Sequence, residues 1–509
     1  MMKKLHSCTL LGLDGIITEV ESDVALGLPG FEIVGLPDAA VKESRERVRA
    51  AIKNCGYEFP SRKYTINLAP ANIRKEGPSY DLPIALSVLA ACGQMEGATD
   101  EYVFLGELSL SGEIRPVKGV FPAVLSAKEN GFSKVLLPFK NAQEAALVEG
   151  VSVYGAKTLY DAVCHIEGSN PIHPTVLDRE SMINPASPDY GIDFSEVKGQ
   201  ENVKRALEIA AAGGHNCLII GSPGSGKTML AQRLPTILPD LNMEEALEVT
   251  KIHSIAGVLD EGTPLAVTRP FRSPHHSIST MGLVGGGTVP RPGELSLAHN
   301  GVLFLDEFPE IKTDATEVMR QPLEDGRVTI SRVAASYTFP CKTMLVAAMN
   351  PCKCGYFGDR SRRCRCSSTA VTKYLSKISG PLIDRMDIQT EAPSISYEQL
   401  GARPAESSAQ IKKRVTACRH IQAERYKGRG IHCNASLSGA NIEKYCILTS
   451  EAKRLIKDAF EALGLSARAY SRILKVSRTI ADLEQSENIT EIHIAEAVQY
   501  RSLDKKFWG

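Results

Sequence analysis

Short apolar runs that stop at a glycine or a polar residue divide the middle of the chain into segments of strand length. Three of these runs, CLIIG at 217–221, VLFLDE at 302–307 and MLVAAMN at 344–350, are separated by segments with a helical period. Runs that are apolar on both faces are typical of parallel sheets, because crossover helices cover the two sides. The pattern therefore predicts an α/β fold with a parallel sheet before residue 395.

Different patterns flank this segment. Toward the N-terminus, β-branched runs such as KYTINLAP at 63–70 alternate with helical stretches, and one predicted helix begins at the N-cap Asp38 and ends at Gly56. Toward the C-terminus, apolar residues at i, i+3 and i+4 predict helices at 451–464 and 468–484. We expect a second α/β domain before the parallel sheet and a helical lid domain after it.

Changes in composition mark the predicted domain boundaries. Residues 168–191 are rich in Pro, Ser and Asn and lack a helical or strand period, as expected of a linker. A softer change lies near 391–408. Since 509 residues exceed what one hydrophobic core normally holds, we predict domains at 1–167, 192–395 and 396–509.

Composition and charge narrow the class of protein. With 43% hydrophobic and 23% charged residues, the chain has the composition of an ordinary soluble globular protein. Its formal net charge is zero, so binding to nucleic acid would have to rest on local basic patches. No stretch approaches about 18 uninterrupted apolar residues, the length that a membrane-spanning helix needs. We expect a cytoplasmic protein whose 13 cysteines are mostly reduced.

A glycine-rich loop follows the predicted strand at 217–221 and precedes a predicted helix. Its residues are Gly221, Ser222, Pro223, Gly224, Ser225, Gly226, Lys227 and Thr228. Glycines let backbone N–H groups approach phosphate oxygens, while Lys227 would neutralise the outer phosphates and the Thr228 hydroxyl would ligate Mg²⁺. Because a strand and a helix flank the loop as this chemistry requires, we predict that ATP and Mg²⁺ bind here.

Polar side chains at the ends of two further strands complete a predicted hydrolysis site. Asp306 would hold the magnesium ion and Glu307 would polarise the attacking water. Asn350 ends the next apolar strand, where its amide would orient water near the γ-phosphate. An acidic pair at a strand end is common by itself, and the coincidence with the glycine-rich loop is what favours catalysis.

Three arginines are candidates for the positive charge that hydrolysis requires at the transition state. They are Arg385 in SGPLIDRMD and Arg468 in SARAYSRILKVSR, with Arg472 as a substitute for Arg468. An arginine finger can accelerate hydrolysis by about 10³ to 10⁵. Each arginine taken alone would be interpreted as part of a solvated helix face, and their order after Asn350 is what favours a catalytic role.

The ordered set GSPGSGKT, LFLDE, AAMN and SGPLIDRMD, with the later arginine-bearing helix, resembles the AAA+ ATPases. Within them it resembles the magnesium-chelatase-like branch that is shared with replicative MCM helicases. The segments RPFRSPHHSIS and NPCKCGYFGD narrow the resemblance to competence proteins of the YifB and ComM type. This resemblance covers nearly the whole chain. It implies a homohexameric ring with ATP between subunits, in which Arg385 reaches the neighbouring subunit's nucleotide and Arg468 acts as a second sensor.

The same resemblance implies that insertions in the ATPase core protrude into a central pore. One segment that fits is the glycine-rich 279–296 with the preceding RPFRSPHH. The other is 327–342, in which alternating flanks around 334–336 predict a β-hairpin with Arg332 near its tip.

The function that the resemblance implies is that of an ATP-dependent DNA motor. Such a helicase or branch-migration factor would promote the integration of DNA during natural transformation and recombination, and its partner would be single-stranded or branched DNA. The alternative is an ATPase subunit of the magnesium-chelatase type, which serves metal insertion into a porphyrin. An ATP-dependent protease is a third alternative, raised by the N-terminal sequence.

Two N-terminal segments, KEGPSYDLPIALSVLAA and GELSLSGEIRPVKGVFPAVLSAKENGFSKVLLP, are similar to the proteolytic domain of Lon proteases. Ser79 lies at the place of the nucleophile, which needs a base to activate it. The resemblance puts Ala123 where Lon has its lysine, and Lys118 lies five residues earlier. We therefore expect 1–167 to be an inactive Lon-protease-like domain, a platform for ring formation or DNA contact, in which Ser79 is a buried hydroxyl or a helix cap.

Four of the cysteines are clustered in a predicted insert at 350–366. They are Cys352, Cys354, Cys364 and Cys366, two C-x-C pairs with nine residues between them. Four thiolates can close a tetrahedral zinc site, and the spacing allows a small loop to fold back. A reduced loop without metal and a redox site are the alternatives, whereas disulfides are disfavoured in a reducing compartment. We expect Zn²⁺ in an architectural role.

The same insert is strongly basic. Arg360, Arg362, Arg363 and Arg365 crowd it, and they could bind the phosphates of a nucleic acid or acidic residues of a neighbouring subunit. The alternative is a solvated basic loop. A second basic run, at 411–432, is predicted to be the exposed face of a helix.

Overall fold

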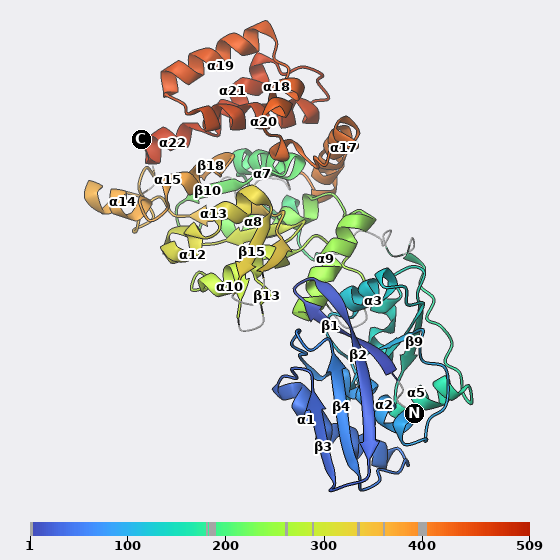
Figure 1. The fold of residues 1–509 in the computed structure, drawn as a ribbon. Helices are drawn as coiled ribbons and strands as arrows, with labels where there is room; N and C mark the ends of the chain where they lie inside the picture. The colour runs from blue at the N-terminus through green and yellow to red at the C-terminus, as the bar shows by residue number, and fades with distance from the viewer. Residues whose placement is uncertain are drawn as a thin grey trace. The chain divides into compact units, whose positions relative to one another are not determined.

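The computed structural model describes most of the chain (Figure 1). The described residues are 4–179, 182, 190–259, 263–287, 290–332, 336–359, 362–394 and 405–508. They form two compact units. The first unit contains residues 1–185, 242–267 and 331–339, and the second contains residues 186–241, 268–330 and 340–509. Two segments from the middle of the chain therefore belong to the N-terminal unit.

A seven-stranded mixed sheet forms the centre of the first unit, in the order β3-β4-β2-β1-β5-β8-β9. Its strands are β1 (Lys4–Leu11), β2 (Asp14–Ala25), β3 (Gly30–Val34), β4 (Lys63–Ala69), β5 (Tyr102–Phe104), β8 (Lys134–Pro138) and β9 (Ser152–Ala156). β2 pairs antiparallel with β1 and β4, and the remaining pairs are parallel. The short strands β6 (Glu107–Leu108) and β7 (Ile114–Arg115) form a separate hairpin. The strand predicted at 63–70 is confirmed as β4.

Helices pack on this sheet. They are α1 (Ala39–Asn54), α2 (Asp81–Ala91), α3 (Val120–Glu129), α4 (Ala142–Ala145), α5 (Leu159–Glu167) and α9 (Met243–Ala256). α1 begins where the sequence predicted, because the carboxylate of Asp38 accepts a hydrogen bond from the Val41 N–H at 2.7 Å. Such an N-cap stabilises a helix by about 1 kcal/mol. α2 is buried along nearly its whole length, so the N-terminal unit has a core of its own.

The helix α9 lies within the predicted ATPase core but packs against α3 of the first unit. The carbonyl of Ser254 accepts a hydrogen bond from the Gly119 N–H at 3.0 Å, directly before α3 begins. Lys251 pairs with Asp14 at 3.1 Å, and the Ser254 hydroxyl donates to the half-enclosed carboxylate of Glu144. These polar contacts surround the junction of α9 with α3.

A five-stranded parallel sheet forms the centre of the second unit, in the order β11-β14-β17-β10-β18. Its strands are β10 (Cys217–Gly221), β11 (Phe271–Arg272), β14 (Val302–Leu305), β17 (Met344–Met349) and β18 (Ile388–Ala392). The predicted parallel sheet is confirmed, and β10, β14 and β17 are its three apolar runs. Since the carboxyl ends of parallel strands share one edge of a sheet, the polar residues after these strands are brought together there.

Helices α7 (Glu201–Gly213) and α8 (Lys227–Arg233) pack on the sheet of the second unit, and further short helices lie around it (Figure 1). These are α10 (Thr280–Val284), α11 (Glu294–Leu297), α12 (Thr313–Glu317), α13 (Arg320–Asp325), α14 (Ser368–Leu375) and α15 (Gly380–Ile383). Two short two-stranded sheets complete this part of the chain: β12 (Gly285–Gly286) pairs antiparallel with β13 (Arg291–Pro292), and β15 (Arg327–Ser331) pairs with β16 (Ser336–Pro340), of which residues 331–339 group with the first unit. The predicted hairpin at 327–342 is therefore confirmed, although residues 333–335 at its turn lie outside the described part of the chain.

The C-terminal part of the second unit is helical, as predicted. Its helices are α17 (Ser408–Tyr426), α18 (Ala440–Tyr445), α19 (Ser450–Leu463), α20 (Ala467–Leu483), α21 (Glu491–Gln499) and α22 (Ser502–Phe507). The helices predicted at 451–464 and 468–484 correspond to α19 and α20 within one residue at each end. The basic run on α17 is only partly an exposed face, because Arg425 turns inward and pairs with the buried Asp482.

Buried charges tie these C-terminal helices together. Asp482 of α20 has a fully buried carboxylate that pairs with Arg425 at 2.5 Å and with Arg478 at 3.0 Å. Removing one partner of such a buried pair typically costs about 3 to 5 kcal/mol, because a charge is left without compensation. Apolar residues of α7, α17 and α20 share one core with the sheet around this network.

The predicted domain boundaries stay a prediction, and the contact pattern adds one feature to them. Residues 242–267 and 331–339 lie in the predicted ATPase core by sequence, yet they group with the first unit. Within the described ranges, no helix combines the length and the apolar character needed to cross a membrane.

Candidate active site

The loop between β10 and α8 has the backbone of a phosphate-binding loop. Gly224 and Gly226 have φ angles of 78° and 84°, in the left-handed region that favours glycine. Gly226 is the N-cap of α8, which begins at Lys227. A Cβ at either glycine would meet nothing within 4 Å, so the backbone conformation requires glycine and the space around it is open. Backbone N–H groups in such a loop can bind the oxygens of an anion.

The Lys227 side chain is held over this loop. Its Nζ donates to the carbonyls of Gly221 and Ser222, both at 2.9 Å, and to Oδ1 of Asn350 at 3.2 Å. Burial lowers the pKa of the Lys227 ammonium from its ordinary value, and the charge of Asp306 acts in the opposite direction. A negatively charged ligand beside this ammonium would offset the cost of burial and favour the protonated form.

A hydroxyl and a carboxylate meet beside the loop. The Thr228 Oγ1 donates to Oδ2 of Asp306 at 2.6 Å, and the backbone N–H of Glu307 donates to the other carboxylate oxygen of Asp306 at 2.8 Å. Both side chains are accessible to solvent. Oxygen ligands of this kind suit Mg²⁺, which prefers one or two protein oxygens together with waters and phosphate oxygens. The pair formed by Thr228 and Asp306 fits such an ion.

The Glu307 carboxylate contacts a histidine that the sequence did not associate with it. Glu307 has a left-handed φ of 48°, and its Oε2 lies 3.0 Å from Nδ1 of His276. His276 comes from the loop after β11, and its ring packs on that of His275 with centroids 4.0 Å apart. Sequence reasoning placed RPFRSPHH only in a pore segment. No apolar run marks this position in the sequence, because β11, the strand that precedes it and lies beside β14, has only two residues.

The predicted arginines have other partners in the chain. Arg385 lies between α15 and β18, where its guanidinium donates to the carbonyls of Arg320 at 2.9 Å and Pro381 at 2.8 Å and pairs with Glu324. These partners belong to α13 and α15. The described contacts thus join Lys227 with Asn350 and Thr228 with Asp306, which precedes Glu307. The described partners of Arg385 lie outside this group of residues.

The two arginines of α20 differ in their surroundings. Arg468 is exposed in the first turn of the helix. Arg472, one turn later, forms a salt bridge with the buried carboxylate of Asp387 at the start of β18. Because Arg472 is engaged in this ion pair, Arg468 is the one whose side chain is available for a ligand at the surface.

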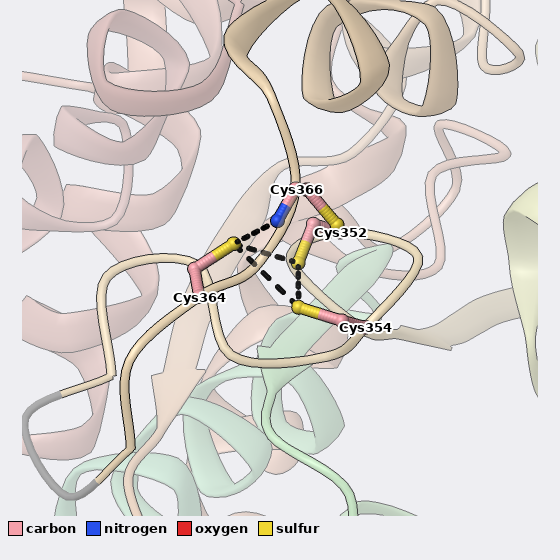
Figure 2. Close-up of side chains that lie close together, drawn as sticks. All are labelled: Cys352, Cys354, Cys364 and Cys366. Carbon is pink, nitrogen blue, oxygen red and sulfur yellow. Dashed lines mark hydrogen bonds between the residues drawn. The ribbon is translucent and has the colours of Figure 1, made fainter.

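The four clustered cysteines come together after β17, as Figure 2 shows. The Sγ atoms of Cys352 and Cys354 are 3.3 Å apart, and that of Cys364 lies 3.7 and 3.5 Å from them; all four ligand atoms lie within 4.8 Å of one another. A tetrahedral site with metal–sulfur distances of about 2.3 Å has sulfurs about 3.8 Å apart. Cys366 donates its backbone N–H to the Cys364 sulfur at 3.4 Å. The donor set and spacing therefore fit Zn²⁺.

The arginines of the insert lie around this cluster. Arg362 is exposed, donates to the Tyr356 hydroxyl at 3.0 Å and lies over that ring. Arg363 and Arg365 are also exposed. Arg332, beside the turn of the β15–β16 hairpin, is exposed as well. Arg360 lies outside the described residues.

The residues expected at a Lon-type site lie in the first unit. Ser79 is half-buried in the short helix η1 (Pro78–Tyr80), and Ala123 is buried on α3. Lys118 lies against Gly257 after α9, where an added Cβ would come within 2.4 Å of the lysine side chain. The position where Lon has its lysine thus offers a buried methyl group in this chain.

Three protein-family descriptions match consecutive parts of the chain. They are "Subunit ChlI of Mg-chelatase" at 20–141, "Magnesium chelatase, subunit ChlI" at 193–400 and "Magnesium chelatase, subunit ChlI C-terminal" at 405–501. The second of these contains the phosphate-binding loop, the acidic pair and the cysteine cluster.

Similarity to individual proteins extends over the whole chain. The chain is 44% identical over 504 residues to the uncharacterized protein YifB of Salmonella typhimurium, with 98% of this chain and 97% of YifB aligned. It is 42% identical over 505 residues to the competence protein ComM of Haemophilus influenzae, with 98% and 97% aligned. The 67 kDa subunit of magnesium chelatase from Chlorobaculum parvum is 30% identical over 166 residues, which are 31% of this chain and 23% of that subunit.

Proposed function

Because the chain belongs to the magnesium-chelatase-like AAA+ family of YifB and ComM, we propose that it is an ATP-driven DNA motor in the cytoplasm. In this proposal a homohexameric ring uses ATP hydrolysis to move single-stranded or branched DNA, and so promotes branch migration during natural transformation and recombination. The observation that carries the proposal is the alignment with the competence protein ComM over 98% of the chain.

In the proposed reaction, the residues at the carboxyl end of the parallel sheet bind and split ATP. Lys227 exchanges the carbonyls of Gly221 and Ser222 for phosphate oxygens, which compensate its charge better than neutral acceptors do. Thr228 and Asp306 would hold Mg²⁺, which would supply positive charge against the charge that develops on the phosphates. This exchange requires only local movement of side chains that are already grouped.

The proposed hydrolysis step uses a water activated by Glu307. The carboxylate accepts a proton from that water as the water oxygen attacks the γ-phosphorus; the bond from this phosphorus to the bridging oxygen breaks, and ADP leaves with that oxygen and its negative charge. Asn350 orients the water from the adjacent strand. Arg385 would supply positive charge to the nucleotide of the neighbouring subunit. Its partners within the chain are residues of α13 and α15 and not residues of the phosphate-binding loop. Arg468 would act as the second sensor from the exposed start of α20.

The proposed DNA contacts are basic side chains on two protruding segments. Arg332 lies on the hairpin of β15 and β16, and Arg362 and Arg363 lie on the cysteine-bearing insert, together with Arg360 by sequence. Contacts with the phosphate backbone are independent of sequence and weaken as salt rises. We further propose Zn²⁺ at the four cysteines. The Lon-protease-like domain has no proteolytic role in this proposal, because Ala123 supplies no base to Ser79.

The magnesium-chelatase alternative has weaker support. The chelatase subunit aligns with 31% of this chain, whereas ComM aligns with 98% of it. An N-terminal Lon-protease-like domain and a four-cysteine insert are features that metal insertion into a porphyrin does not require.

ATPase assays on the purified full-length protein test the proposal. Branched or single-stranded DNA should stimulate hydrolysis, and Lys227→Ala should abolish nucleotide binding. Casein cleavage that is lost in Ser79→Ala would instead indicate a protease. Stimulation only by a porphyrin-binding partner would favour the chelatase, and hydrolysis that no DNA structure alters would contradict the motor.

A further inference from the structure

The cysteine-bearing insert, residues 350–366, begins at a residue of the candidate nucleotide site. It begins after β17 at Asn350, whose side chain accepts a hydrogen bond from Lys227 at 3.2 Å. Cys352 follows two residues later and has no exposed surface. The first ligand of the proposed metal is therefore a buried residue directly beside the phosphate-binding loop.

The turn that carries Cys352 and Cys354 packs directly against the phosphate-binding loop. Gly355 donates its N–H to the Cys352 carbonyl at 2.9 Å and has a φ of 84°. A Cβ on Gly355 would lie 2.4 Å from Cδ and 2.6 Å from Cγ of Pro223, in the phosphate-binding loop. Real Cβ atoms do not approach ring carbons this closely, so only glycine allows the turn to lie against Pro223. The cysteine pair and the loop thus share a tightly packed boundary.

The other side of the insert contacts the C-terminal helix α22. The rings of Phe357 and Phe507 have centroids 6.3 Å apart. Lys506 of α22 also pairs with Glu391 at 2.7 Å. Glu391 is the strand partner of Ile220, which precedes the loop on β10. The insert is therefore held between the phosphate-binding loop and the C-terminus of the chain.

No regular secondary structure fixes the described part of the insert. The described residues from 350 to 366 contain no helix or strand, and α14 begins only at Ser368. Its described arginines, Arg362, Arg363 and Arg365, are exposed. A metal that joins Cys352 and Cys354 to Cys364 and Cys366 would close the loop across nine residues and fix the position of Gly355.

We propose that a Zn²⁺ ion at Cys352, Cys354, Cys364 and Cys366 holds Gly355 against Pro223 and thereby keeps the phosphate-binding loop in its nucleotide-binding conformation. The site couples metal occupancy to nucleotide affinity. This inference rests on the proposed binding of ATP at Lys227. Since coupling between two binding sites is reciprocal, bound nucleotide stabilises the metal site by the same factor.

The test compares nucleotide affinity with and without the metal in the full-length protein. Zinc content is measured by elemental analysis, and the affinity for a fluorescent ADP analogue with Mg²⁺ is measured before chelation, after chelation and after Zn²⁺ is restored. Chelation should weaken nucleotide binding by about tenfold or more, within the range typical of coupled sites, and Zn²⁺ should restore it. Release of zinc to a chelator should be slower in the presence of Mg-ADP.

A pair of glycine variants separates coupling from loss of folding. Gly355→Ala keeps all four cysteines and should retain zinc, but its methyl group displaces Pro223 and should weaken nucleotide binding by about tenfold. Gly358→Ala is the matched control, because its φ of 78° gives a similar backbone strain while its Cβ would meet only the end of the Lys506 side chain at 3.6 Å. Nucleotide binding should be unchanged in this control.

The outcomes distinguish this inference from the function on which it rests. Nucleotide affinity that is unchanged after zinc removal, or a protein that binds nucleotide without ever holding zinc, overturns the coupling and leaves the ATPase proposal intact. A zinc-loaded protein that binds no nucleotide overturns both. Equal affinities of Gly355→Ala and Gly358→Ala also contradict the inference.

Discussion

The residues at the carboxyl end of the parallel sheet are already paired with one another before any ligand binds. Lys227 is held by two backbone carbonyls and by Asn350, and Thr228 donates to Asp306. Each of these hydrogen bonds can be exchanged for a bond to a phosphate or a metal ion without movement of the backbone. Such preorganisation lowers the cost of binding, because few side chains have to be ordered.

Replacing Glu307, the proposed general base, should separate nucleotide binding from hydrolysis. Glu307→Gln keeps the shape of the side chain but removes its ability to accept a proton. We expect nucleotide affinity to stay near that of the parent protein, and the rate of hydrolysis to fall by about 10² to 10⁴, the usual contribution of a general base. Fluorescent nucleotide binding and phosphate release measure the two quantities. Turnover at the normal rate would contradict the role of Glu307.

His276 is predicted to position the same carboxylate. Its Nδ1 lies 3.0 Å from Oε2 of Glu307, so His276→Ala should leave Glu307 less well oriented and lower kcat by about tenfold. The affinity for nucleotide should not change, because the described contacts of His276 are with Glu307 and His275 and not with the loop residues that would hold phosphate. His420→Ala, which removes an exposed histidine of α17, is the control. Equal effects of the two substitutions would argue against a positioning role.

The site residues that could be predicted from the sequence are those that directly follow an apolar strand. Lys227, Asp306 and Asn350 follow β10, β14 and β17, and a parallel sheet places such residues at one edge whatever the rest of the fold does. His276 follows β11, a strand of two residues that is too short to give an apolar run. Its contact with Glu307 depends on how one loop folds over another, which local periodicity does not encode.

Helices, like site residues, were predictable where a local sequence pattern determines them. α19 and α20 have apolar residues at helical spacing, and capping side chains at Thr449 and Ser466 fix where they begin. Both were predictable within a residue. The inward turn of Arg425 on α17 was not, because its partner Asp482 lies on a helix 57 residues away and was not visible as a pair in the sequence.

A buried histidine of the second unit, His215, makes the free energy of unfolding of that unit depend on pH. Burial lowers the pKa of His215, so the unfolded chain takes up a proton at a higher pH than the folded protein does. Its neighbour Asp387 is also buried, which by itself would raise the pKa of its carboxyl, but the charge of Arg472 and a hydrogen bond with His215 hold that pKa below its ordinary range. Both groups therefore stabilise the fold at neutral pH and lose that contribution as the pH falls, His215 below about 6.5 and Asp387 below about 4.

The His215→Gln variant tests this pH dependence. Glutamine does not titrate, so the free energy of unfolding should change less between pH 7 and pH 5 than in the parent protein, by up to about 1.4 kcal/mol for each pH unit. Urea unfolding followed by the fluorescence of Trp508, the single tryptophan, reports on the second unit. His420→Gln replaces an exposed histidine of α17 as the control. Identical pH slopes in parent and variant would contradict the account of His215.

In the whole molecule, one helix of the predicted ATPase core, α9, groups with the N-terminal unit, which the order of the motifs along the chain does not reveal. Motif order predicts one continuous ATPase core, but α9 packs on α3 and groups with the N-terminal unit through Ser254, Gly119 and Glu144. These contacts join residues more than 100 positions apart, and their side chains are ordinary surface types. Only the three-dimensional arrangement identifies them. The resemblance to a known family did predict the order of the domains along the chain.

Binding to DNA should depend on the charged insert in a defined way. Replacing both Arg362 and Arg363 by alanine should weaken binding to any DNA sequence and reduce the slope of log affinity against log salt by about 2, one for each lost phosphate contact. Replacing Lys453 and Arg454, which are exposed on α19, by alanine removes the same charge elsewhere and should leave the slope unchanged. Fluorescence anisotropy with labelled DNA at several salt concentrations gives both slopes. A loss of binding that is equal in the two double variants would show that only the total charge matters.

Strand exchange on a synthetic three-stranded DNA junction tests the central claim most directly. The purified full-length protein is mixed with the junction and Mg²⁺, with or without ATP, and the released strand is quantified on a gel. The account predicts release only with ATP, and none with Glu307→Gln or Lys227→Ala. Release that is the same without ATP, or no release by a protein that hydrolyses ATP and binds the junction, would contradict an ATP-driven DNA motor.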